Sequence, residues 1–136
     1  MFVLDTNVVS ELRKQTKGNP GVLAWAVQQQ PHQLFVAAVT IMELEYGVLL
    51  QERKDPVAGA VLRNWFDNAV LPGFDQRILP MDTAVARCCA SMHVPNRRPE
   101  RDAIIAATAI VNGMTVVTRN VGDFQGAGAA ILNPWK

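Results

Sequence analysis

The sequence has little cysteine and no long apolar run, and both shortages exclude classes of protein. Its two cysteines, Cys88 and Cys89, are neighbours, and adjacent side chains on a helix point in different directions, so we do not expect a disulfide framework. No apolar stretch approaches the ~20 residues of a membrane-spanning helix. The first expected strand begins at Met1, with no basic leader segment before it. We therefore expect a cytoplasmic protein with two buried or half-buried free thiols.

The sequence also lacks the motifs of several enzyme classes. Neither His32 nor His93 falls in a motif, and the chain has no Gly-x-Ser-x-Gly elbow, phosphate-binding loop or zinc-type spacing of Cys and His. The net charge is only +1, which by itself does not indicate a nucleic-acid partner. With 136 residues, 49% of them hydrophobic and 18% charged, the composition is that of a globular protein. We expect one domain covering residues 1–136.

Short apolar runs alternate with helical segments along the chain. We expect strands at residues 1–4, 34–39, 77–81, 115–118 and, at an edge of the sheet, 130–132. Helix starts are indicated at Asn19-Pro20, Thr40, Asp55-Pro56, Asp82-Thr83 and Pro99, and a helix end at Gly113. Strands that alternate with helices indicate a parallel sheet covered on both faces. The prediction is therefore a three-layer α/β/α fold with a central, mostly parallel sheet of four or five strands.

Four of the twelve acidic residues lie where such a fold can bring carboxylates together. Asp5 and Asp123 directly follow expected strands, and Glu43 and Asp102 are expected in the first turns of helices. Sites in these folds form outside the carboxyl ends of the strands, where the strand order reverses. Converging carboxylates repel one another and need a cation between them, and hard oxygen ligands suit Mg²⁺ or Mn²⁺. A metal centre of this kind is a common means of cutting a phosphodiester.

Each of these acids also has a structural explanation. Asp5 could cap the helix after the first strand, and Glu43 could complete a capping box with Thr40. Asp102 could interact favourably with a helix dipole, and Asp123 could satisfy its own backbone in an Asx-turn between glycines. The residues by themselves leave both readings open at each position.

Taken together, the segments around these acids resemble the PIN-domain family, in particular the VapC/FitB-type toxins of bacterial toxin–antitoxin pairs. The resemblance extends to Asn133-Pro134-Trp135 and selects the same four acids out of twelve, whereas Glu45 matches no acid of the family. The segments that carry it are Leu4-Asp5-Thr6-Asn7, Thr40-Ile41-Met42-Glu43, Asp102-Ala103-Ile104-Ile105 and Thr118-Arg119-Asn120-Val121-Gly122-Asp123.

The resemblance implies a toxic Mg²⁺-dependent endoribonuclease that hydrolyses RNA phosphodiester bonds by metal-activated water. By this reading Asp5, Glu43, Asp102 and Asp123 hold one or two Mg²⁺ ions, for which Mn²⁺ substitutes. Products would carry a 5′-phosphate, because the 2′-hydroxyl is not the nucleophile. Polar positions near the family's pocket, which would form hydrogen bonds around the metal ligands, correspond to Thr6, Asn7, Thr118 and Asn120.

The resemblance also implies partners. These are a cognate antitoxin that occludes the site, a second copy of the chain in a homodimer or in a higher assembly with the antitoxin, and operator DNA reached only through the antitoxin. Apolar helix faces around Trp25 and Trp65 are candidate surfaces, although both tryptophans could equally belong to the core. The motifs are flanked by bases that could hold RNA phosphates or simply solubilise the surface, namely Arg97, Arg98, Arg101 and Arg119.

Two other functions are open to a chain of this pattern. A catalytically inactive PIN-like module could act with a DNA-binding partner in transcriptional repression, but the intact acids at all four positions argue against it. A phosphatase could use Asp5 as its nucleophile, but that chemistry calls for a second acid two residues later, where this chain has Asn7.

Overall fold

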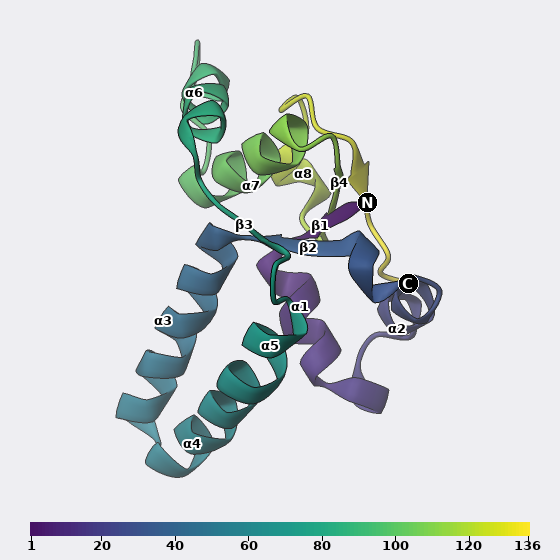
Figure 1. Cartoon of the computed structure of the whole chain (residues 1–136), viewed down its shortest axis with the longest axis vertical. Helices are drawn as coiled ribbons and strands as arrows, with labels where there is room; N and C mark the ends of the chain where they lie inside the picture. The colour runs from purple at the N-terminus through teal and green to yellow at the C-terminus, as the bar shows by residue number, and fades with distance from the viewer.

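A five-stranded parallel sheet crosses the middle of the molecule in the computed structural model, which describes all residues from 1 to 136 (Figure 1). The strand order is β3-β2-β1-β4-β5, so β5 forms an edge as expected. This sheet with its covering helices confirms the predicted fold class. The strands are β1 (Phe2–Leu4), β2 (Leu34–Ala37), β3 (Ile78–Leu79), β4 (Thr115–Val117) and β5 (Ile131–Leu132).

Helices cover both faces of the sheet, which makes the three layers visible in Figure 1. One face carries α1 (Thr6–Arg13), α2 (Pro20–Val27), α3 (Ala38–Lys54), α4 (Pro56–Trp65) and α5 (Leu71–Gly73). The other carries α6 (Thr83–Met92), α7 (Glu100–Val111) and α8 (Val121–Phe124). Short helical turns at Gln15–Lys17 and Pro31–Gln33, and a π-helical stretch at Phe66–Val70, complete the element order.

The apolar runs of the strands supply both cores, because successive side chains point to opposite faces of a sheet. In β1, Leu4 belongs to the cluster under α1 to α4, and Val3 belongs to the cluster under α7 and α8. In β4, Val117 and Val116 divide in the same way. All four are fully buried, so the central strands are covered by apolar clusters on both faces of the sheet.

The strand order reverses between β1 and β4, and this creates a switch point at the carboxyl ends of these two strands. From β1 the chain adds β2 and then β3 on one side, and it returns to add β4 and β5 on the other. The register pairs Leu4 with Val117, so the two strands end side by side. Asp5 and Thr118 therefore follow neighbouring strand ends at the switch point, where sites of open α/β sheets form.

Most of the expected helix starts are confirmed by capping hydrogen bonds. Asn19 Oδ1 accepts from the backbone N–H of Gly21 and Val22, and Asp55 and Asp82 cap α4 and α6 in the same way. Gly113 has φ +67° just after α7, as expected of a helix stop. Cys88 and Cys89 lie on α6 as free thiols, the first half-buried and the second buried.

Two local predictions are wrong. Helix α3 begins at Ala38 and not after Thr40, because β2 runs straight into the helix and Ala37 takes the cap position without any side-chain hydrogen bond. Because the helix begins at Ala38, Thr40 is a buried residue within it and Glu43 lies in its second turn. Glu43 therefore completes no capping box. Asp123 lies in the first turn of the short helix α8 and not in a loop.

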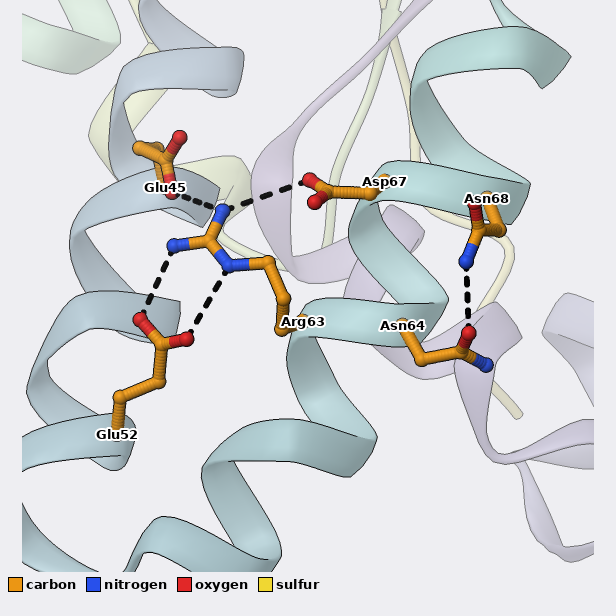
Figure 2. A network of polar contacts seen from close by, with 6 residues as sticks. All are labelled: Glu45, Glu52, Arg63, Asn64, Asp67 and Asn68. Atoms are coloured by element: carbon orange, nitrogen blue, oxygen red, sulfur yellow. Dashed lines mark hydrogen bonds and ion pairs between the residues drawn. The ribbon is translucent and has the colours of Figure 1, made fainter.

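Arg63 joins α3 to α4, the two helices that project from the sheet as a paired arm (Figures 1 and 2). Its guanidinium donates to Glu45 at 2.6 Å, to both carboxylate oxygens of Glu52 at 3.1 and 3.3 Å, and more weakly to Asp67 at 3.4 Å. Glu45, which matches no family acid, is thus held in an ion-pair network of the arm. Glu43, two residues earlier, lines a different part of the surface.

The two tryptophans singled out from the sequence pack against the core and remain partly exposed. Trp25 meets the ring of Phe2 edge to face, with centroids 5.2 Å apart, and Trp65 packs against the same apolar cluster. Trp65 also lines a small apolar hollow with Val9, Leu12 and Phe74. None of the helices combines the length and the apolar character that crossing a membrane requires.

Candidate active site

Asp5 is the most buried of the four candidate acids, with 5% of its surface exposed. It caps α1 through a 2.7 Å hydrogen bond from the Thr6 backbone N–H to Oδ1. Its other oxygen, Oδ2, accepts hydrogen bonds from the Thr118 hydroxyl at 2.7 Å and from the Asn7 amide at 3.2 Å. One carboxylate oxygen of Asp5 therefore caps α1, and the other accepts hydrogen bonds from residues at the strand switch point.

Burial dominates the electrostatics of Asp5. Desolvation raises the pKa of this carboxyl, the hydrogen bonds from Thr118, Thr6 and Asn7 partly oppose the rise, and the charge of Asp123 adds to it. The carboxylate is thus strongly hydrogen-bonded yet has no cationic partner, because no lysine or arginine forms an ion pair with it.

The polar residues expected around the metal ligands form a connected frame. Thr118, which is fully buried, donates to Asp5 and accepts from the backbone N–H of Asn120 at 2.9 Å. Asn7 donates to Asp5 and accepts from the backbone N–H of Arg119 at 3.4 Å. These bonds tie the loop after β4 to the start of α1, and so fix the direction in which Asp5 points.

Glu43 approaches this frame from α3. Its Oε1 accepts from the Thr6 hydroxyl at 3.1 Å, and that hydroxyl also lies 3.2 Å from the hydroxyl of Thr40. Its Oε2 lies 3.6 Å from Arg101 Nη1, an ion pair in which the Glu43 side chain is 21% exposed and the Arg101 side chain 51%. An ion pair this exposed contributes little to stability.

Asp102 lies in the first turn of α7, as predicted. Its pKa is raised to about 6, mainly by burial, and the neighbouring charges of Asp5, Asp123 and Glu43 contribute to the same rise. Asp123 is exposed on α8, but its charge acts on both Asp5 and Asp102. The fold therefore brings the four acids into one repelling group, with Asp123 at its margin.

Three of the four acids line one cavity of about 450 Å³, and Asp123 is not among its lining residues. The lining also includes Asn7 and Asn120. Four further lining residues were not proposed as site residues from the sequence, namely Ser10, Glu11, Lys14 and Trp135. A signal for some of these was present, because positions 7, 11 and 14 share one face of a helix. Trp135 belongs to the last segment of the family resemblance, but nothing in the local sequence placed it at the site, which it reaches only through the fold.

The donor set fits a hard divalent cation. The carboxylates supply oxygen ligands only, and the negative charge around Asp102 lacks compensation except for the Arg101–Glu43 pair. As they stand, no three of the Asp, Glu, His or Cys side chains converge closely enough to ligate a single ion directly. Mg²⁺ usually keeps several waters and binds through one or two carboxylates, so an open arrangement of this kind suits it.

Comparison with known proteins agrees with this architecture along the whole chain. The profile of the PIN domain family matches residues 2–127. The VapC ribonuclease Y4jK of Sinorhizobium fredii is 35% identical over 100% of this chain and 99% of its own, and Toxin FitB of Neisseria gonorrhoeae is 38% identical over 99% of both. The solved structure of FitAB bound to an IR36 DNA fragment matches at a TM-score of 0.89 and 35% identity, covering 100% of this chain and 96% of that chain. The chain belongs to the PIN-domain family, with relatives of the VapC and FitB type.

Proposed function

We propose that this chain is a Mg²⁺-dependent endoribonuclease and the toxin of a toxin–antitoxin pair. The observation that carries the proposal is the cavity at the strand switch point, which is lined by Asp5, Glu43 and Asp102. Relatives that are similar over their full length bear the names VapC ribonuclease and Toxin FitB. RNA is the substrate that the first name gives for its own protein, and we extend it to this chain.

In this proposal Asp5, Asp102, Asp123 and Glu43 hold the ion, with Mn²⁺ as a substitute. Because no three of them converge on one point, some of these carboxylates would act through waters of the ion. The bound ion supplies Lewis-acid chemistry, by activating water and by neutralising charge on the phosphate. Thr118 and Asn7 keep the Asp5 carboxylate pointing to the cavity through their hydrogen bonds. Thr6 does the same for Glu43. Asn120 closes the frame through its backbone N–H.

Basic side chains at the cavity support a polyanionic substrate. Arg101 lies against Glu43, and Lys14 and Arg119 are among the lining residues, with Lys14 paired to Glu11. Such bases hold RNA by its phosphates without reading its sequence. They would keep the strand over the carboxylates, which by themselves repel it.

The proposed partners follow from the same family. The relative's solved structure is a FitAB complex on DNA, which supports an antitoxin as the partner of this chain and operator DNA as a ligand reached through that antitoxin. The hollow beside Trp65 and the exposed apolar residues of α3 and α4 are surfaces that suit an antitoxin or a second copy of the chain. The exposed residues are Met42, Tyr46, Leu49, Leu50, Val57 and Val61.

Expression in a bacterium without the antitoxin tests this proposal. Wild type, Asp102→Asn and the control Glu45→Gln are induced to matched protein levels, growth is followed, and RNA 5′ ends are sequenced. We expect wild type and Glu45→Gln to stop growth and to create the same new 5′-phosphate ends, and Asp102→Asn to do neither. If Asp102→Asn is as toxic as wild type, the assignment of the metal ligands is wrong. If wild type creates no new ends and acts only as a repressor with its partner, the catalytically inactive module is the better description.

A further inference from the structure

The lining of the cavity includes residues that the metal-binding proposal does not use. Among them are Lys14, Arg119 and Trp135, contributed by the end of α1, the loop after β4 and the C-terminal tail. Of the eleven residues that line the cavity, Trp135 is the hydrophobic one. Lys14 is paired with Glu11 at 3.0 Å, whereas Arg119 lies beside the indole. An aromatic ring and a base in the same cavity as the carboxylates suit a ligand with both a phosphate and a flat apolar face.

The tail that carries Trp135 is fixed on both sides of the indole. The Trp135 backbone N–H donates to Asn133 Oδ1 at 3.0 Å, and Lys136 exchanges two hydrogen bonds with the Asn19 side chain, at 2.8 and 3.1 Å. The tail lies so close to α2 that a Cβ on Gly21 would stand 2.3 Å from the carbonyl oxygen of Pro134. The backbone that carries the indole is therefore fixed before any ligand arrives, which lowers the entropy cost of binding.

Arg119 links the indole to the carboxylate frame. Its guanidinium lies over the Trp135 ring, 5.7 Å from the centroid, and its backbone N–H donates to Asn7, which in turn donates to Asp5. No carboxylate forms an ion pair with the Arg119 side chain. Its charge acts on the Glu11 carboxylate without forming an ion pair, so the guanidinium can still bind a phosphate. The backbone of Arg119 is fixed relative to the proposed metal ligands.

We propose that Trp135, together with Arg119, forms a stacking platform for an RNA base next to the phosphate that is cut. This inference rests on the proposed ribonuclease activity. The Arg119 guanidinium, which lies over the indole, shifts to the backbone phosphate, and the base of the same nucleotide takes its place on the ring. Single-stranded RNA exposes its bases for such stacking, which tolerates any base because each has a π-face. The platform therefore favours unpaired RNA and adds affinity without dictating one sequence.

The alternative is that Trp135 only stabilises the fold, since it also packs against the main apolar cluster. Trp25 provides the control, because it packs against the same cluster but does not line this cavity. Replacing either tryptophan by leucine removes an aromatic ring from the same cluster. Only the change at position 135 removes a ring from the proposed RNA path.

Binding is measured in an Asp102→Asn background, so that RNA stays intact. The probes are a fluorescent single-stranded RNA of random sequence and an abasic ribose-phosphate strand of equal length. We expect Trp135→Leu to weaken binding of the RNA by about 5- to 100-fold and to remove the preference for RNA over the abasic strand. Trp135→Phe should keep that preference, Trp25→Leu should leave both affinities unchanged, and Arg119→Ala should weaken both strands alike.

An Asp102→Asn protein with both tryptophans intact that binds the two strands equally well would overturn the platform, whatever the tryptophan variants do. So would a Trp135→Leu protein that is indistinguishable from Trp25→Leu. RNA cleavage by protein that retains Asp102 separates this proposal from the ribonuclease itself. If the wild type cleaves RNA and Trp135→Leu leaves its KM unchanged, the platform proposal fails and the ribonuclease proposal stands. If the wild type cleaves no RNA but the chain binds RNA through Trp135, the ribonuclease proposal fails and the platform proposal stands.

Discussion

Thr118 and Asp5, which are 113 positions apart in the chain, meet in a buried hydrogen bond of 2.7 Å. The bond joins the ends of β4 and β1, and it uses the carboxylate oxygen of Asp5 that does not cap α1. Thr118 also accepts from the backbone of Asn120. One hydroxyl therefore holds the central acid of the site and the loop beside it.

Replacing Thr118 by valine, which has nearly the same shape, should damage both stability and activity. The change leaves Asp5 with one donor fewer and the Asn120 N–H without its acceptor, at a cost of about 1–3 kcal/mol. Thr118→Ser keeps the hydroxyl and should recover most of the loss. Denaturant unfolding and RNA cleavage by the two variants check this, and a Thr118→Val enzyme with wild-type rates would show that the orientation of Asp5 does not depend on the bond.

Glu43→Gln should separate charge from structure. Gln can keep the hydrogen bond from Thr6, and the exposed pair with Arg101 contributes only ~0–1 kcal/mol, so the free energy of unfolding should change little. Cleavage should fall by about 10- to 100-fold or more, because a charged ligand of the ion is lost. The matched control is Glu45→Gln, which touches only the Arg63 network (Figure 2). Equal cleavage by the two variants would contradict the role of Glu43.

The pKa of Asp102 predicts a stability that falls as pH rises. The folded protein binds this proton more tightly than the unfolded chain, because the pKa is about 6 instead of the ordinary 3.8. Ionisation therefore lowers the free energy of unfolding between about pH 4 and pH 7. In EDTA at pH 7, Asp102→Asn should be more stable by about 1 kcal/mol after allowance for solvent screening, or ~2–5 °C in Tm.

At about pH 4 that gain should vanish, because the wild-type carboxyl is then largely protonated. Thermal melts of both proteins across this pH range give the comparison. A difference between wild type and Asp102→Asn that is constant with pH would mean that repulsion among the four acids does not act on the fold.

Two glycines on the α3–α4 arm should respond in opposite directions to alanine. A Cβ on Gly59 would stand 2.4 Å from the Cα of Glu52, so Gly59→Ala forces the helices apart and should cost about 1–3 kcal/mol. Gly47 has open space around it within α3, so Gly47→Ala should stabilise the protein by about 0.5–1 kcal/mol. Chemical denaturation of both variants tests the close approach, and a neutral Gly59→Ala would show that the helices can separate freely.

Local signals in the sequence sufficed for most of the fold. Asn19, Asp55 and Asp82 cap helices where the sequence indicated, and the apolar runs became parallel strands. The start of α3 could not be read in this way. Thr40 and Glu43 have the spacing of a capping box, but β2 continues directly into the helix and the Thr40 hydroxyl turns to Thr6. At the start of α3, which carries Glu43, tertiary contacts and not the local pattern determine where the helix begins.

The site itself was predictable only in part. The acids at 5, 43 and 102 could be chosen because the segments around them resemble the PIN-domain family, and the structure brings them to one cavity. Their role as metal ligands stays a prediction. The Arg119–Trp135 pair depends on a tail that folds back to α2 through Asn19 and Gly21. The contact between the tail and α2 produces no periodic pattern in the sequence, because Asn19 and Lys136 are 117 positions apart.

The most direct measurement is the metal dependence of RNA cleavage by the purified chain without an antitoxin. Carboxylate sites of this kind prefer Mg²⁺ or Mn²⁺, and Ca²⁺ can occupy them with a looser geometry that serves phosphoryl chemistry poorly. We predict cleavage with Mg²⁺ or Mn²⁺, none in EDTA, a sharp fall with Ca²⁺, and products with 5′-phosphate ends. Cleavage that proceeds in EDTA and leaves 2′,3′-cyclic phosphate ends would contradict the claim that the four acids act by holding a metal ion.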